Sequence, residues 1–158
     1  MKRYLHNEEE TEQFGAELCQ LLPEKCLIFL QGQLGAGKTT LVRGFLRAVG
    51  FSGVVKSPTY TLVEEYLIKQ RKIVHFDLYR LIDPEELEWI GIRDYIDQNC
   101  TCFIEWPEQG KGFLPEPDGV ITLHNDGVGR LVTLTIKNRH KDNILTKKQS
   151  HRLFSRTS

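Results

Sequence analysis

The alternation of apolar and polar positions predicts strands and helices in a regular order along the chain. Residues 7–22 carry apolar side chains at the three- and four-residue spacing of a helix, and Pro23 ends that pattern. Residues 26–30, CLIFL, form a short, wholly apolar run that is typical of a strand buried on both faces. A glycine-rich segment follows, and residues 39–49 then predict an amphipathic helix that ends at Gly50. A strand, a loop and a helix in this order favour an α/β domain.

The rest of the chain predicts more strands than helices. The sequence DPEE at 83–86 is typical of a helix start, with an acidic N-cap, a proline at the first helical position and a glutamate at the third. We expect that helix to run to about residue 96. Two strands joined by KQR precede it, a buried strand follows it, and a hairpin across NDGVG comes last. The expected strands are residues 60–67, 72–78, 100–106, 120–124 and 131–137.

Length and composition fit one globular domain. The chain has 158 residues, of which 40% are apolar and 27% charged, which is enough to bury a core. The net charge of zero is unevenly spread, because seven basic residues stand against one acidic residue from position 137 onward. We expect a single domain over residues 1–138 and a basic, flexible tail over 139–158. Such a tail either contacts RNA or is simply solvated, and the sequence leaves both interpretations open.

Several features favour a cytoplasmic protein without a membrane segment. No apolar run approaches the roughly 20 residues needed to cross a bilayer, and the N-terminal residues turn acidic where a signal peptide would be apolar. The four cysteines lack the repeated spacing of zinc ligands. We therefore interpret all four as small apolar core residues.

The glycine-rich segment predicts a phosphate-binding loop. Residues 32–39, GQLGAGKT, match G-x-x-x-x-G-K-[ST] between a strand and a helix, where the mechanism requires the loop. Glycines let successive backbone N–H groups turn towards an anion, and the helix N-terminus adds positive charge. Lys38 can reach the β- and γ-phosphates, and the Thr39 hydroxyl can coordinate Mg²⁺. The residues predicted to bind ATP or ADP here are Gly32, Gly35, Ala36, Gly37, Lys38, Thr39 and Thr40.

The phosphate loop and the strand pattern together predict the fold class. We expect a P-loop NTPase-like three-layer α/β sandwich, whose mixed sheet has a parallel core and an antiparallel edge hairpin.

Two acidic residues stand where a P-loop enzyme needs a carboxylate at a strand end. Glu105 ends the apolar run CTCFIE, and Asp77 ends KIVHFD. We assign Glu105 to the metal and Asp77 to the γ-phosphate side, although the two roles can be exchanged. Asp77 and Lys38 are therefore the predicted catalytic residues. His75 lies on the same strand face as Asp77, and we favour a packed, hydrogen-bonded histidine over a catalytic one.

The segment Ser57, Pro58, Thr59 and Tyr60 lies between the phosphate-loop helix and the Asp77 strand. In nucleotide switches, that interval holds a segment ordered by the γ-phosphate and its metal. Two hydroxyl groups and a backbone restricted by proline suit such a switch, and they suit an ordinary loop equally well.

Four segments together resemble the TsaE family, formerly called YjeE. They are GQLGAGKTT, SPTYTLVEEY, HFDLYRL and IEWPE, and the resemblance covers roughly residues 5–137. Members of this family are small bacterial P-loop ATPases that work in making N6-threonylcarbamoyladenosine in tRNA. They associate with TsaB and with TsaD, which transfers the threonylcarbamoyl group to adenosine.

The resemblance implies an ATP-hydrolysing subunit that reaches tRNA indirectly, through the complex with TsaB and TsaD. It implies Mg²⁺ coordination by Thr39 and Glu105, a requirement for Asp77 in hydrolysis, and a switch at residues 57–60. Thr11 in ETEQFG and Arg130 in VGRLVTL would lie near the nucleoside. Trp106 also fits the family pattern, and packing in the core is its simplest role.

The main alternative is a stand-alone small-molecule or nucleoside kinase that uses the same loop. Such kinases commonly add an arginine-bearing lid, whereas the middle of this sequence has no arginine-rich insertion. A GTPase is disfavoured because the sequence lacks an N-K-x-D segment. The residues of the site fit a slow ATPase and a nucleotide-binding scaffold without turnover equally well. Only the resemblance to the TsaE family favours the ATPase.

Overall fold

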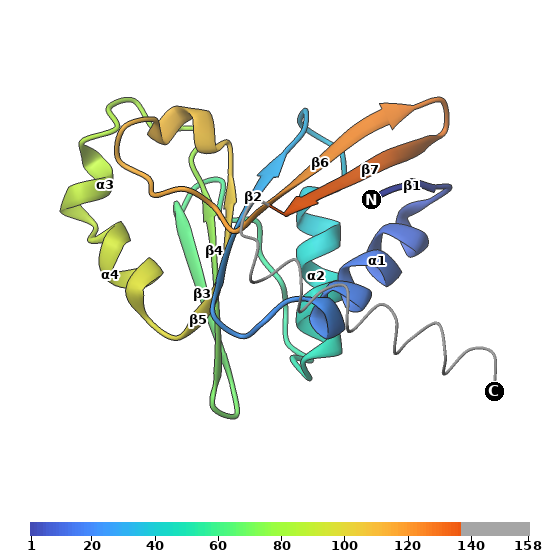
Figure 1. Ribbon diagram of the computed structural model, residues 1–158, viewed down its shortest axis with the longest axis horizontal. Helices are drawn as coiled ribbons and strands as arrows, with labels where there is room; N and C mark the ends of the chain where they lie inside the picture. Colours follow the sequence, from blue (N-terminus) through green and yellow to red (C-terminus); the bar gives the residue numbers. More distant parts are fainter. Residues whose placement is uncertain (137–158) are drawn as a thin grey trace.

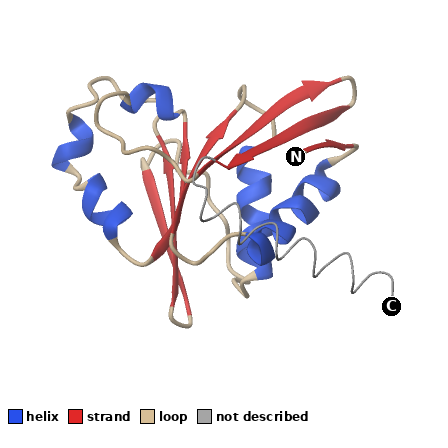
Figure 2. Cartoon of the chain, in the orientation of Figure 1, coloured by secondary structure: helices blue, strands red, loops and turns tan. Residues whose placement is uncertain are grey.

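The computed structural model describes residues 1–136, which form one mixed sheet between two layers of helices (Figures 1 and 2). The seven strands of this part of the chain lie in the order β1-β7-β6-β2-β5-β4-β3. The strands are β1 (Lys2–Leu5), β2 (Cys26–Gln31), β3 (Val63–Ile68), β4 (Arg71–Asp77), β5 (Cys100–Glu105), β6 (Gly119–Asp126) and β7 (Gly129–Ile136). The helices are α1 (Glu8–Leu21), α2 (Lys38–Ala48), α3 (Glu86–Trp89), α4 (Ile92–Asp97) and the 3-10 helix η1 (Pro107–Gly110).

The layers follow from the alternation of side chains along the strands. On β4, Ile73 faces the core beneath α1 and α2, whereas Val74 and Phe76 face the core beneath α3 and α4. Figure 1 shows the two helix pairs on opposite sides of the sheet. Strands β4, β5, β2 and β6 run parallel, and β3, β7 and β1 are antiparallel to their neighbours. This confirms the predicted three-layer α/β sandwich with a parallel core.

The edges of the sheet differ in detail from the expectation. The predicted hairpin forms between β6 and β7, but β1 pairs with β7 and makes the edge itself. Four residues are too few to give β1 a recognisable period in the sequence. The hairpin strands also extend to a two-residue turn, where Gly127 has a φ of 61°. The turn therefore has the left-handed backbone of a tight hairpin.

The helix predicted from DPEE starts two residues later than expected, at Glu86, and does not continue to residue 96. The Asp83 carboxylate accepts a hydrogen bond from the Glu85 backbone N–H at 3.0 Å, in the turn that precedes α3. The chain then breaks at Gly91, whose φ of 73° separates α3 from α4. The prediction of one continuous helix was therefore wrong, because a left-handed glycine interrupts an otherwise regular apolar stripe.

Helix α1 crosses the phosphate-loop helix α2 at two glycines. A Cβ atom at Gly15 would lie 2.0 Å from the Leu41 carbonyl oxygen, and one at Gly44 would lie 2.0 Å from the Glu12 carbonyl oxygen. The backbones are thus in direct contact at this crossing. Close packing here fixes the position of α2, and with it the phosphate loop at its N-terminus.

Gly44→Ala is expected to destabilise the fold by about 1–3 kcal/mol, because the added methyl group overlaps the backbone of α1. The measurement is chemical denaturation, with Gln20→Ala on the exposed side of α1 as the control. Alanine in an open helix would instead stabilise by about 0.5–1 kcal/mol. A gain in stability would therefore contradict the close crossing.

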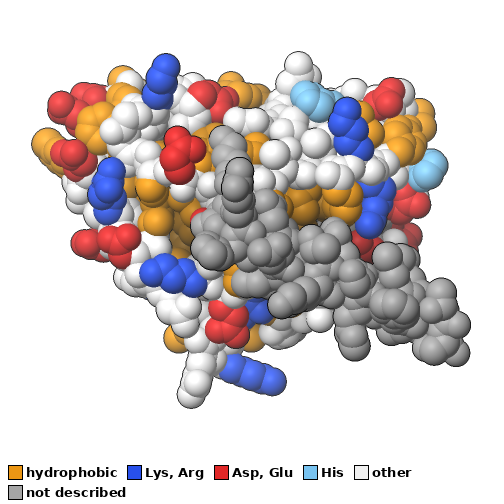
Figure 3. All heavy atoms as spheres, in the orientation of Figure 1, with side chains coloured by type: hydrophobic (Ala, Val, Ile, Leu, Met, Phe, Trp, Pro, Cys, Tyr) orange, Lys and Arg blue, Asp and Glu red, His pale blue; other side chains and the backbone are white. Residues whose placement is uncertain are grey.

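The longest helix of the described residues, α1, has 14 residues. None of their helices is both long and apolar enough to cross a bilayer. The face in Figure 3 intersperses acidic and basic side chains. The predicted tail over 139–158 lies outside the described residues, so the expected domain boundary at residue 138 stays a prediction.

Candidate nucleotide site

The glycine-rich loop joins the carboxyl end of β2 to the N-terminus of α2. Gly35 and Gly37 have φ values of 77° and 104°, a region that side chains with a Cβ rarely adopt. Gly37 is the N-cap of α2, so the first N–H groups of the helix face the loop. The Lys38 ammonium group donates to the Gly32 carbonyl oxygen at 2.5 Å, and this folds the lysine back over the loop. The predicted loop therefore has the backbone geometry of a phosphate cradle.

The loop forms one wall of a cleft of about 340 Å³. The other walls come from the N-terminus of α1, the segment before β3, the ends of β4 and β5, and the start of β7. The cleft is lined by Glu8, Leu34, Gly35, Gly37, Lys38, Thr39, Thr40, Ser57, Thr59, Asp77, Glu105, Trp106 and Arg130. Most of the residues predicted for the site are therefore brought together.

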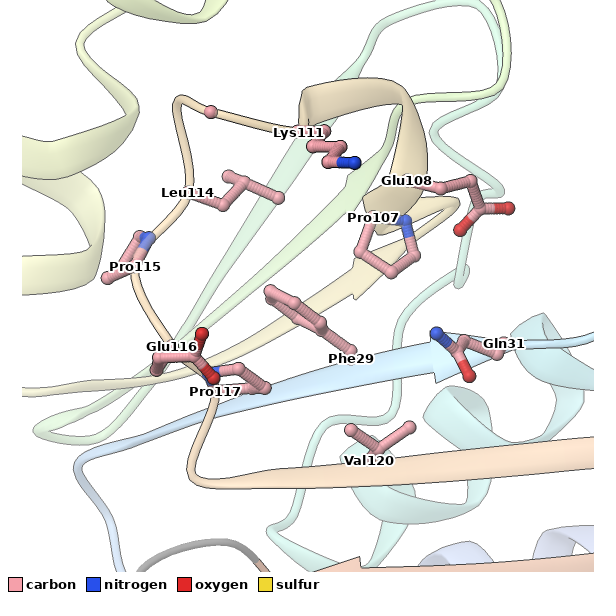
Figure 4. A pocket seen from close by; sticks show the side chains of 11 residues that line it. Phe29, Gln31, Pro107, Glu108, Lys111, Leu114, Pro115, Glu116, Pro117 and Val120 are labelled. Carbon is pink, nitrogen blue, oxygen red and sulfur yellow. The ribbon is translucent and has the colours of Figure 1, made fainter.

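A second cavity of about 330 Å³ lies beside the 3-10 helix η1 (Figure 4). Phe29, Leu114 and three prolines supply much of its wall, and Figure 4 shows Phe29 and Pro107 facing each other across it. Among residues 1–136, the two sets of lining residues do not overlap. The charged residues that line this cavity are Lys111, Glu108 and Glu116, two acids against one base, so the first cleft is the better candidate for a phosphate site.

Asp77 and Glu105 lie side by side at the carboxyl ends of two parallel strands. Their Cα atoms are register partners, and Glu105 is also the partner of Leu30 at the end of β2. Both acids are buried, with 4% and 3% exposure. The Lys38 Nζ atom lies 3.8 Å from Glu105 Oε1. Two carboxylates and the loop lysine therefore meet in one buried corner of the cleft.

Burial raises the pKa of the Asp77 carboxyl above its ordinary value. The neighbouring Glu105 charge acts in the same direction, while hydrogen bonds from the Tyr79 N–H and the Thr59 hydroxyl oppose it. Burial likewise lowers the pKa of Lys38, against the attraction of both carboxylates. The site thus holds charged groups in a poorly solvated place, as functional sites often do.

Asp77→Asn is expected to raise the melting temperature of the nucleotide-free protein at pH 7 by about 2–4 °C. An acid whose pKa is raised by folding supports the folded state fully at low pH, and this support is lost as the pH rises through its folded pKa. Asparagine does not titrate, so its advantage should shrink as the pH falls through the raised pKa of Asp77 towards the ordinary aspartate value. Thermal unfolding in EDTA from pH 4 to 8 measures this, with the exposed Asp97→Asn as control. An advantage that is absent, or independent of pH, would contradict the assigned burial cost.

His75 is completely buried and hydrogen-bonded to the predicted metal ligand. Its Nε2 atom lies 2.6 Å from Glu105 Oε2. The prediction of a packed, hydrogen-bonded histidine is therefore confirmed. The sequence placed His75 on the Asp77 face of β4 but did not identify Glu105 as its partner.

The predicted switch segment contacts the site through its hydroxyl groups. The Thr59 hydroxyl donates to Asp77 Oδ2 at 3.1 Å, and the Ser57 and Thr59 hydroxyl oxygens lie 2.7 Å apart. Pro58 is buried, and its carbonyl oxygen accepts from a downstream backbone N–H. Tyr60 is 83% exposed and lies against the Arg80 guanidinium outside the cleft. Ser57 and Thr59 thus line the cleft, and the switching itself stays a prediction.

The two residues expected near the nucleoside lie in different surroundings. Arg130 lines the cleft, and its Nη2 atom donates to the Gly35 carbonyl oxygen at 2.9 Å. Thr11 is completely buried beneath Gly37, and its hydroxyl donates to the Asn7 carbonyl oxygen at 3.2 Å. Ala36 is also buried, in the core of the α1 and α2 layer. Arg130 is therefore placed to contact a ligand, whereas Thr11 is placed to support the loop.

Comparison with known proteins shows the family to which this chain belongs. The model of the family described as threonylcarbamoyl adenosine biosynthesis protein TsaE matches residues 5–132. This chain belongs to the TsaE family. The family works in tRNA threonylcarbamoyladenosine biosynthesis, as the resemblance implied.

Relatives of similar length support this membership. The TsaE of Haemophilus influenzae is 46% identical over 151 residues, which cover 92% of this chain and 96% of that protein. The TsaE of Bacillus subtilis is 32% identical over 137 residues, which cover 85% of each protein. The crystal structure of Bacillus subtilis YdiB superposes with a TM-score of 0.81 at 25% identity, covering 96% of this chain and 95% of that one. The similarity therefore extends over nearly the whole fold.

The structure of this TsaE family member adds cleft residues that the sequence did not assign to the site. Trp106, expected to pack in the core, also lines the cleft with its ring centroid 4.2 Å from Lys38 Nζ. Its φ of 56° is unusual for a large side chain. Glu8 and Leu34 complete the wall. Leu34 lies inside the predicted loop at residues 32–39 and Trp106 stands next to Glu105, so both had a signal in the sequence, whereas Glu8 had none.

The chemistry of the donor set fits magnesium. Thr39 offers a hydroxyl oxygen and Glu105 a carboxylate oxygen, both of which are hard ligands that Mg²⁺ prefers. Residues 1–136 hold no group of three or more histidine, cysteine or acidic side chains arranged to bind a metal. In P-loop proteins the nucleotide and water supply most of the ligands of magnesium.

Proposed function

We propose that this chain is the subunit that binds and hydrolyses ATP while the threonylcarbamoyl group is formed on N6 of adenosine in tRNA. The observation that carries this proposal is the buried corner where Lys38, Asp77 and Glu105 meet beside the glycine loop. A phosphate cradle, a cation and two strand-end acids are the parts that ATP hydrolysis requires. Membership of the TsaE family supports the part of the proposal that concerns threonylcarbamoyladenosine biosynthesis.

Each residue of the corner has a distinct task in this proposal. The loop N–H groups and Lys38 bind the β- and γ-phosphates. Thr39 and Glu105 would hold Mg²⁺, which when bound neutralises charge on the phosphate oxygens. Asp77, held by the Tyr79 N–H and the Thr59 hydroxyl, orients the water that attacks the γ-phosphorus. Its raised pKa brings it closer to the range in which a carboxylate can accept a proton from that water.

The contact between Thr59 and Asp77 supports a nucleotide-driven switch. Thr59 belongs to the segment at residues 57–60, and Asp77 faces the γ-phosphate side of the cleft. A change at the γ-phosphate can therefore reach this segment through one hydrogen bond. We propose that the segment reports the nucleotide state to TsaB and TsaD, that tRNA is engaged through that complex, and that the work takes place in the cytoplasm.

ATP turnover by the isolated chain is expected to be slow, and addition of TsaB and TsaD should increase it at least about tenfold. The physical reason is that a switch subunit reaches its hydrolysing geometry only when partners hold the segment at residues 57–60. Release of phosphate is measured with the chain alone, with each partner and with both. Rapid transfer of phosphate from ATP to a small acceptor by the isolated chain would instead favour the kinase alternative.

A further inference from the structure

We propose that His75 is a positioning residue, which fixes the Glu105 carboxylate so that one oxygen is kept for the magnesium side of the cleft. This inference rests on the proposed function, because it concerns the Mg²⁺ that accompanies the nucleotide. It assigns a role to a buried histidine that neither binds phosphate nor lines the cleft wall.

The sheet geometry places the histidine behind the acid. His75 is the register partner of Phe103 on the parallel strand β5, and Asp77 is the register partner of Glu105. Because side chains alternate along a strand, His75, Asp77 and Glu105 all project to the face that carries α2. His75 stands one side-chain period further from the strand end than Asp77. It can therefore contact the carboxylate from inside the protein, leaving the cleft side open.

The two oxygens of Glu105 have different surroundings. Oε2 lies 2.6 Å from His75 Nε2, and both side chains are at least 96% buried. Oε1 faces the Lys38 ammonium at 3.8 Å, at the mouth of the phosphate loop. A carboxylate anchored through one oxygen cannot rotate freely about its last bond. The other oxygen is thus presented in one direction, which is what a ligand of hydrated Mg²⁺ requires.

The surroundings of Nδ1, the second ring nitrogen of His75, indicate which of the two nitrogens carries the proton. Nδ1 is buried and has no hydrogen-bond partner in residues 1–136. A proton placed on Nδ1 would leave a buried donor unpaired and set two acceptors, Nε2 and Oε2, against each other at 2.6 Å. The arrangement therefore favours the proton on Nε2, where it is donated to Glu105. Within residues 1–136, the imidazole is therefore hydrogen-bonded through Nε2 to Glu105, while Nδ1 has no partner.

Three variants separate positioning from packing. His75→Gln places an N–H donor about as far from the backbone as Nε2 is. His75→Asn places the donor too close to the backbone to reach Glu105. His75→Leu replaces the ring with an apolar side chain of similar volume that has no donor. The affinity for Mg²⁺ is measured by titrating the metal into the full chain with ADP, and the affinity for ADP alone is measured in EDTA. We expect the leucine and asparagine variants to bind Mg²⁺ about 10–100-fold more weakly than the parent. The glutamine variant should stay within about threefold, and ADP affinity in EDTA should be unchanged in all three.

Two results would overturn the positioning role. One is a leucine or asparagine variant whose Mg²⁺ affinity stays within about threefold of the parent. The other is an equal loss of ADP affinity in EDTA, which would show that the whole loop had moved. If the leucine variant does not fold, the asparagine and glutamine pair decides, because these differ only in reach. A parent chain whose ADP binding does not respond to Mg²⁺ would instead contradict the proposed function, and the role of His75 with it.

Discussion

Replacement of Lys38 by alanine is expected to weaken ATP and ADP binding about 100-fold and to abolish ATP turnover. Lys38 is the ammonium group of the phosphate loop, and it lies buried between the Gly32 carbonyl and Glu105. Its loss removes a charge-assisted contact worth about 2–3 kcal/mol, which corresponds to a factor of about 30–150 in affinity. It also leaves the buried Glu105 carboxylate without the cation 3.8 Å away, so phosphate anions meet uncompensated negative charge.

The matched control for this experiment is Lys72→Ala. Lys72 forms an ion pair with Glu65 at 3.0 Å, away from the residues that line the cleft. The Lys72→Ala substitution removes one positive charge, as Lys38→Ala does, without changing the phosphate loop. Calorimetry with ADP and ATP measures both variants, and unfolding curves confirm that both fold. An alanine variant of Lys38 with the parent's affinity and turnover would refute the phosphate site.

Asp77→Asn is expected to preserve ATP binding within about threefold while reducing turnover about 100-fold or more. Asparagine keeps the shape of the side chain, and its amide oxygen can still accept from the Tyr79 N–H. Its NH₂ group can only donate to the Thr59 hydroxyl, and it cannot accept a proton from the attacking water. General-base assistance contributes typically 10²–10⁴-fold, so the loss appears in kcat and not in affinity. The same variant should be more stable at pH 7, because the burial cost of the charge is removed.

Glu105→Gln tests whether the two acids have been assigned correctly. That variant should lose the response of ADP binding to Mg²⁺, whereas Asp77→Asn should retain it. The exposed Asp97→Asn serves as the control for removal of one negative charge. Undiminished turnover in Asp77→Asn would reject its role in hydrolysis. If Asp77→Asn loses the Mg²⁺ response and Glu105→Gln keeps it, the two roles are exchanged.

The parts of the fold that rest on strong local patterns could be predicted from the sequence. The CLIFL run predicted the central strand, and the glycine pattern predicted the loop that enters α2. The strand-end positions of Asp77 and Glu105 also followed, because both residues close apolar runs and parallel strands end at the same edge. These features depend on neighbours in sequence, or on a rule that holds for every parallel sheet.

Features that depend on tertiary contact could not be predicted in the same way. The four residues of β1 become a strand only because β7 offers them an edge. Nothing local indicates that Glu105 would find His75 beneath it, or that the Trp106 ring would lie over Lys38. Thr11 is buried where it lies against Gly37 of the loop, 26 positions further along the sequence. In each case, the decisive partner lies far away in the sequence.

The most direct test of the central claim follows ATP consumption and threonylcarbamoyladenosine formation together, in one reaction with tRNA, TsaB and TsaD. With the parent chain, both should proceed through repeated cycles. With Asp77→Asn, nucleotide should still bind, but ATP consumption should fall about 100-fold and repeated modification should stop. If tRNA modification continues at the parent's rate while ATP hydrolysis is lost, hydrolysis by this chain does not drive the cycle, and the account is contradicted.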